Sequence, residues 1–149
     1  MKSKSIANES DTKNASELMA AFTAVVKQAQ RFFQQSAECT DSSNLRRQFS
    51  TLAQLHQQVL FLLPHDQHNN AAAVAADFND LYLWYHSALH DTSQRPYLQR
   101  IRRQLDKQLQ LQKSMIRANV LSQYKMNLLH FTASLQIAAD QLAETTTPL

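Results

Sequence analysis

The chain has 149 residues, of which 44% are hydrophobic and 18% are charged, with no glycine and a formal net charge of +3. At ordinary usage a chain of this length holds roughly ten glycines. Their absence excludes nucleotide-binding loops that need glycine for close backbone approach. Tight hairpins and strand bulges also depend on glycine, so the composition predicts an all-α protein of long helices joined by short polar connections.

Polar residues without hydrophobic periodicity open the chain, so we expect residues 1–13 to form a disordered leader. They lack the apolar stretch of a secretory signal, and no run of the chain approaches the 18 apolar residues of a transmembrane helix. The single cysteine, Cys39, cannot form an internal disulfide, which fits a reducing compartment. We therefore expect a cytoplasmic protein that does not bind a membrane.

Two apolar seams at helical spacing follow this leader. Asn14 and Glu17 have the spacing of a helix N-cap with a reciprocating acid, which predicts a helix over about 14–38. A polar turn separates it from a second helix over about 44–63, which Pro64 ends. A connection this short makes the two helices antiparallel neighbours. The predicted seams are Leu18, Phe22, Val25, Ala29 and Phe32, then Leu45, Phe49, Leu52, His56, Val59 and Leu63.

A shorter helix over about 71–89 follows a polar loop, with Phe78, Leu81 and Tyr85 on its apolar side. If residues 94–143 then formed one helix, it would be about 75 Å long and half of its apolar stripe would be unmatched. We place a break near Ala118-Asn119, because asparagine is the best left-handed cap in a chain without glycine. This predicts helices over about 94–117 and 121–143 and a frayed tail at 145–149. Their seams are Leu98, Ile101, Leu105, Leu109, Met115 and Ile116, then Tyr124, Leu128, Phe131, Leu135, Ala138 and Leu142.

These elements predict one domain over residues 14–144, built as a four-helix bundle of two helical hairpins with an extra helix in the crossover between them. The second predicted helix contains a Leu-x3-Phe-x3-Ala pattern, formed by Leu45, Phe49 and Ala53. The first contains a Phe-x3-Ala pattern, formed by Phe33 and Ala37, and the crossover helix carries Trp84. The patterns resemble the second and first helices of ferritin-like proteins, and the tryptophan resembles that of an uncharacterised bacterial family of metal-free ferritin-like bundles. The resemblance covers roughly residues 15–143. It implies a ferritin-like up-down bundle and, by family analogy alone, a stress-related role.

The di-iron chemistry of such bundles requires a Glu-x-x-His motif on each of two helices. This chain has no such motif, and its glutamates lie only at positions 9, 17, 38 and 144. In rubrerythrin-like members the pattern would place Glu at the position of His56 and His at the position of Val59, so the metal function is not carried over. We expect His56 to be a hydrogen-bonded core histidine rather than a ligand, and we expect no cofactor.

A different metal site remains an alternative. His86 and His90 lie four residues apart, and hence on one helical face, which is the geometry that can hold a divalent cation. Asp91 is close enough in sequence to act as a third ligand, and the loop residues His65 and His68 could add more. The competing interpretation is a set of solvated histidines.

Charge is unevenly divided along the chain. Residues 1–91 hold seven Lys/Arg against nine Asp/Glu, a net of −2, whereas residues 92–149 hold eight against three, a net of +5. Basic residues of the fourth predicted helix fall within about half of its circumference, away from the leucine seam. They are Arg95, Arg100, Arg103, Lys107, Lys113 and Arg117, with Gln99, Gln104, Gln108 and Gln110 filling in the solvated face.

The leading hypothesis is a non-enzymatic helical bundle that acts as an interaction or structural protein, either with a protein partner or as a homo-oligomer. The alternative is a divalent-metal-binding bundle that uses the helix-face histidines. A third is binding of an acidic partner or a nucleic acid through the basic helix. Aromatic residues for base stacking do not interleave with that helix, apart from Tyr97, which argues against nucleic acid. Self-association is expected through exposed aromatic surface at Tyr82, Trp84 and Tyr85.

Overall fold

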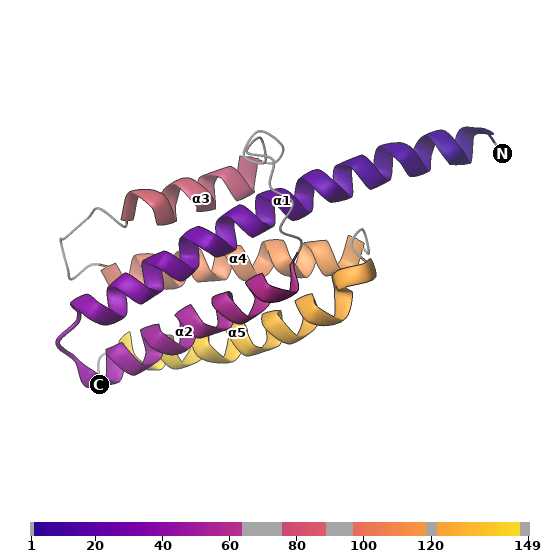
Figure 1. Ribbon diagram of the computed structural model, residues 1–149. Coiled ribbons are helices and arrows are strands. Elements are labelled where there is room, and N and C mark those ends of the chain that lie inside the picture. The colour runs from indigo at the N-terminus through magenta and orange to yellow at the C-terminus, as the bar shows by residue number, and fades with distance from the viewer. Residues whose placement is uncertain (1, 64–75, 89–96, 119–121, 147–149) are drawn as a thin grey trace.

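The computed structural model describes residues 2–63, 76–88, 97–118 and 122–146, and Figure 1 shows their arrangement. These segments contain no strand, so the predicted all-α class is confirmed. The helices are α1 (Lys2–Cys39), α2 (Ser43–Leu62), α3 (Ala76–Ala88), α4 (Tyr97–Ala118) and α5 (Lys125–Thr146), with a short 3-10 helix, η2 (Ser122–Tyr124), before α5.

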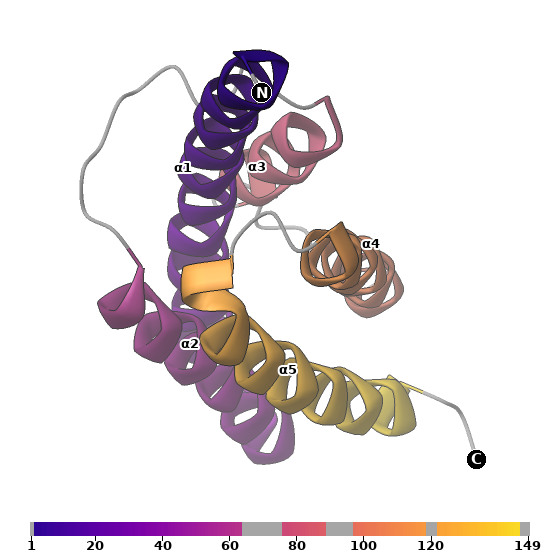
Figure 2. The ribbon, with the colours of Figure 1, turned by 90° about the vertical axis from the view of Figure 1, so that its right-hand side faces the viewer.

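The helices form a closed ring, which Figure 2 shows from one end. α1 packs against both α2 and α3, α2 packs on α5, α5 on α4, and α4 on α3. Within the described segments the backbones of α1 and α4 do not come into contact. The helix expected in the crossover therefore has its own place in the ring, between the first and fourth helices.

The start of α1 differs from the expectation. The helix begins at Lys2, so the predicted disordered leader at residues 1–13 and the predicted N-cap at Asn14 were wrong for the part of the chain that the structure describes. The reason is that residues 2–13 contain neither glycine nor proline, and a helix already formed by the packed part of α1 extends through them at low cost. Figure 1 shows this N-terminal part extending past the ends of the other helices.

Side chains close the turn between α1 and α2, as its composition predicted. The Ser42 hydroxyl caps α2 by accepting a hydrogen bond from the backbone N–H of Leu45, at 3.2 Å. The Arg46 guanidinium donates to the carbonyl of Thr40 at 3.0 Å, and the Thr40 hydroxyl accepts from the N–H of Ser42 at 3.3 Å. The two helices can therefore turn back on each other without a glycine.

The break predicted near Ala118-Asn119 is confirmed, since α4 ends at Ala118 and a separate helix, α5, follows. Asn119 itself lies outside the described residues. α5 continues through Thr145 and Thr146, which contradicts the frayed tail expected from residue 145. No glycine or proline interrupts the sequence of α5 before Pro148, so nothing in its composition stops the helix at residue 144. The predicted helix residues 71–75 and 89 also lie outside the described segments.

The core follows the predicted seams closely. Every predicted seam position whose side chain is described is buried or half-buried. Aromatic rings fill the space where α1 meets α3, with Phe32 against Trp84 at 5.3 Å between ring centroids and Phe33 against Tyr85 at 5.8 Å. None of the described helices is both long enough and apolar enough to cross a membrane.

Candidate functional site

The bundle interior contains a chain of hydrogen-bonded polar side chains, which we call the buried polar network: His56, Tyr85, Gln108, Gln112 and Thr132. All of them are buried, with His56 and Tyr85 at 0% exposure. They come from four different helices, since α2 provides His56, α3 provides Tyr85, α4 provides both glutamines and α5 provides Thr132. The network therefore ties together four of the five α-helices in the described segments.

Gln108 is the centre of this network. Its side-chain nitrogen donates to Nε2 of His56 at 3.0 Å and to Oε1 of Gln112 at 3.0 Å. Its side-chain oxygen accepts from the Tyr85 hydroxyl at 2.8 Å. Gln112 extends the chain by donating to the Thr132 hydroxyl oxygen at 2.9 Å. Both amide hydrogens and the carbonyl oxygen of Gln108 are thus used inside the protein.

The backbone fixes the direction of these bonds. Nδ1 of His56 lies 2.7 Å from the carbonyl oxygen of Leu52, which can only accept, so Nδ1 carries the proton. Nε2 of the neutral ring is then an acceptor, and it must face the NH₂ group of Gln108 rather than its oxygen. The tautomer of one histidine therefore sets the orientation of the Gln108 amide, and through it that of Gln112.

Aromatic rings surround the imidazole and keep it neutral. Phe33 from α1 and Phe131 from α5 lie 5.5 Å and 5.2 Å from it, measured between ring centroids. Burial lowers the pKa of His56 from 6.5 to about 4, although its hydrogen bonds to Leu52 and Gln108 oppose that shift. Burial likewise raises the pKa of the Tyr85 hydroxyl above its usual range. Both groups are therefore uncharged near neutral pH.

The expectation for His56, a buried and hydrogen-bonded core histidine, is confirmed. The expectation that Gln108 lies on the solvated face was wrong, because it is 1% exposed. Gln112 was missed altogether. The predicted seam of α4 did contain a signal for it. The seam passes directly from Leu109 to Met115, six residues later, and helical spacing requires a residue between them on the same side, at position 112.

Of the residues proposed as metal ligands, His86 alone lies in the part of the chain that the structure describes. His86 is exposed on α3, and its ring stacks on that of Tyr82 at 6.0 Å between centroids. His90 and Asp91 lie outside the described residues, as do His65 and His68. No group of three His, Cys, Asp or Glu side chains that could hold a metal ion occurs in the described segments.

The predicted basic stripe lies on the surface of α4. Arg95 is outside the described residues, and the remaining five residues are all exposed; we call them the basic face of α4: Arg100, Arg103, Lys107, Lys113 and Arg117. Lys113 donates to Oε1 of Gln136 on α5 at 3.0 Å, and Arg117 donates to the Ser114 hydroxyl at 3.4 Å. Arg102 and Asp106 are also exposed on this helix, and the sequence interpretation had not included them.

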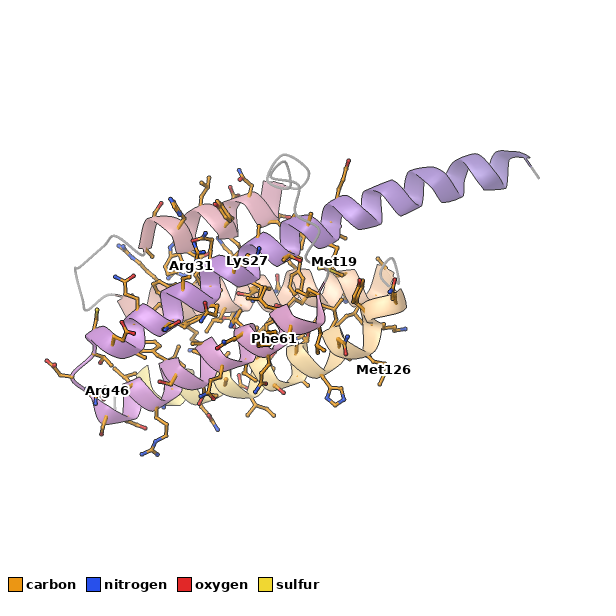
Figure 3. The ribbon with its side chains drawn as sticks, viewed as in Figure 1. Met19, Lys27, Arg31, Arg46, Phe61 and Met126 are labelled. Atoms are coloured by element: carbon orange, nitrogen blue, oxygen red, sulfur yellow. The ribbon has the colours of Figure 1, made fainter. Side chains whose placement is uncertain are left out.

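The exposed apolar surface is not where the sequence placed it. Tyr85 is fully buried, so it cannot contribute to the aromatic surface expected on α3, while Tyr82 and Trp84 are half-buried against the core. Instead, Met126, Leu129 and Ile137 of α5 are 66%, 41% and 61% exposed. Figure 3 labels Met126 near the start of α5 and the exposed Phe61 near the end of α2.

Comparisons with known proteins returned no match, whether made with protein-family models, with curated proteins or with solved structures.

Proposed function

We propose that this protein is a non-enzymatic helical interaction protein that binds an acidic partner through the basic face of α4. The observation that carries the proposal is the division of this helix into two sides. Ile101, Leu105 and Leu109 are buried in the core, while five basic side chains stand exposed away from that seam. A fixed helix with clustered cations attracts and orients an anionic surface.

An acidic protein fits this face better than a nucleic acid does. Asp106 is exposed on the same helix, and at 100° per residue it falls between Lys113 and Arg117 around the helix axis. A carboxylate at that position repels a continuous row of phosphates but tolerates a partner with separated carboxylates. The aromatic side chains that stack on bases in single-stranded nucleic acid complexes do not interleave with the five basic residues.

The role of the buried polar network in this proposal is to hold α4 in place. Gln108 and Gln112 anchor the inner side of α4 to α2, α3 and α5. Because their hydrogen-bonding groups are directed at each other and at buried partners, they support the geometry of the outer side rather than presenting a reactive group to solvent.

Fluorescence anisotropy with a labelled peptide in which glutamates are separated by alanines tests this function. We expect binding that weakens as salt rises and that is lost in the double variant Arg103→Glu/Lys107→Glu. The matched control is Arg31→Glu/Arg47→Glu, two exposed arginines on α1 and α2. Both double variants lower the net charge of +3 by four, so equal losses in the two would show attraction to total charge and contradict the proposal. Tighter binding of a labelled DNA duplex than of the peptide would also contradict it.

The ferritin-like relationship is also a proposal. The two helical hairpins, α1 with α2 and α4 with α5, support it, and a stress-related role in a bacterial cytoplasm follows from it by analogy alone. The position of α3 between α1 and α4 is the feature that such a relationship must accommodate. An experimental structure in which the two hairpins superpose on those of ferritin-like proteins would support it, and a different hairpin arrangement would refute it.

A further inference from the structure

α5 is apolar on two opposite sides. Its inner side carries Leu128, Leu135 and Leu142, all at 0% exposure. Its outer side carries a second apolar row with an exposed alanine in the middle; we call this row the α5 outer face: Met126, Leu129, Ala133 and Ile137. Figure 2 shows α5 between α2 and α4 in the ring, with its remaining side turned away from the bundle. A row of apolar side chains on the outer side of a helix is typical of a surface that a partner covers.

Within the α5 outer face, Leu129 and Ile137 are placed symmetrically about Ala133, whereas the position symmetric to Met126 is Asp140. Leu129 lies four residues before it and Ile137 four residues after it, so these two side chains are about 12 Å apart along the helix. If a second copy of α5 packs antiparallel with the two Ala133 residues opposite each other, Leu129 of each copy lies level with Ile137 of the other. The alanine methyl group lets the two helices approach closely at the crossing, and the larger aliphatic side chains cover each other on either side of it.

The charges flanking this face match the same arrangement. Lys125 lies eight residues before Ala133 and Asp140 seven residues after it, and both are exposed. At 100° per residue they are about 60° apart around the helix and lie on the same side of the line that runs through Ala133. A two-fold axis perpendicular to the plane of the paired helices leaves these residues on the same side of the interface in both copies. Lys125 of each copy therefore meets Asp140 of the other. In a parallel pairing Lys125 and Asp140 of different copies are at different heights along the helices and cannot meet.

We propose that two copies of this chain associate through the α5 outer face as an antiparallel, two-fold symmetric pair. Leu129 packs beside Ile137 of the second copy, and Lys125 lies beside Asp140 of the second copy. Such an interface is isologous, the commonest form of soluble oligomer. The pair also carries two basic faces of α4 in one particle, which strengthens binding to a partner with two acidic sites without any new contact.

Sedimentation equilibrium of the full chain over a range of concentrations tests this pairing. We expect a monomer–dimer equilibrium for the wild type, and a dissociation constant at least about tenfold higher for Ile137→Glu, because the variant buries a carboxylate against Leu129. Leu83→Glu is the matched control, since Leu83 is 48% exposed on α3, away from the proposed interface. Far-UV circular dichroism of both variants checks that they fold, and Leu129→Glu serves if Ile137→Glu does not.

A charge exchange tests the register. Lys125→Glu and Asp140→Lys should each weaken the dimer several-fold, because each places like charges together twice. The double variant Lys125→Glu/Asp140→Lys should return the dissociation constant to near the wild-type value. A wild type that stays monomeric at every concentration overturns the proposal, leaving the face to a different protein. A dimer that Leu83→Glu disrupts and Ile137→Glu does not, or single charge variants that the double variant does not rescue, also overturns it.

Discussion

Nε2 of His56 accepts a hydrogen bond from the side-chain amide of Gln108, and this 3.0 Å contact joins α2 to α4 across the interior of the ring. The two helices do not pack backbone to backbone in the described residues. The contact between them is therefore made by long side chains, and its geometry depends on the protonation of one imidazole and the orientation of one amide.

Replacing Gln108 by leucine should lower the free energy of unfolding by about 2–4 kcal/mol. The leucine leaves Nε2 of His56, the Tyr85 hydroxyl and Oε1 of Gln112 without their partner in the network, and each is buried. Urea unfolding followed by circular dichroism measures the change. Gln110→Leu, at an exposed position of the same helix, should change the free energy by less than about 0.5 kcal/mol. A Gln108→Leu protein as stable as the wild type would show that the network contributes nothing.

The free energy of unfolding should fall in acid because of His56. The unfolded chain binds a proton at this residue near pH 6.5, whereas the folded protein does so only near pH 4. The contribution is therefore complete above pH 6.5 and is lost as the pH falls to about 4, and it amounts to about 3 kcal/mol. Urea unfolding at pH 7 and pH 4 should show a loss larger by this amount in the wild type than in His56→Gln. An equal loss in both proteins would mean that the imidazole is not desolvated.

Tyr85 should resist ionisation in the folded protein. Burial raises the pKa of its hydroxyl, so the unfolded chain loses this proton near pH 10, below the pH at which the folded state does. The contribution of this group to the free energy of unfolding is therefore complete below about pH 10 and declines as the pH rises above it. In an ultraviolet titration of the folded protein, Tyr85→Phe should give the same tyrosinate amplitude as the wild type, which has four tyrosines. A smaller amplitude in the variant would show that Tyr85 ionises without unfolding.

The turn between α1 and α2 offers a test of capping in a chain without glycine. Ser42→Ala removes the oxygen that accepts from the N–H of Leu45, which should cost about 1 kcal/mol of stability. Ser43→Ala, one residue later and also exposed, keeps the cap and should be close to neutral. Thermal unfolding of the two variants under one set of conditions separates the outcomes, and equal melting temperatures would contradict the capping role.

Sequence patterns predicted the helices because burial follows the helical period. Phe22, Val25 and Ala29 of the first predicted seam are all buried, and the apolar residues between Ile101 and Met115 locate the inner side of α4. The start of α1 was not predictable from the same signal, because residues 2–13 carry no hydrophobic periodicity. The polar residues at 2–13 look alike in a helix and in a leader.

The buried polar network was only half predictable. His56 stood on an apolar seam and was expected in the core, but Gln108 and Gln112 belong to a helix with many glutamines. A single glutamine gives no indication of which side it faces, since burial requires partners on other helices that the linear sequence does not bring together. Only the gap in the α4 seam pointed to position 112. The α5 outer face was missed for the opposite reason, because Met126 and Ile137 fall outside the seam that the helical period selected.

The position of α3 between α1 and α4 has a consequence for how the ring opens. A closed cycle of five helices can separate at one joint while the other four joints still hold it together. α3 is the shortest of the described α-helices and its backbone lies mainly against α1, so we expect the joint between α3 and α4 to open first. Backbone amides of α3 should then exchange with solvent deuterium sooner than those in the packed part of α1, through a local opening that leaves the rest of the bundle folded.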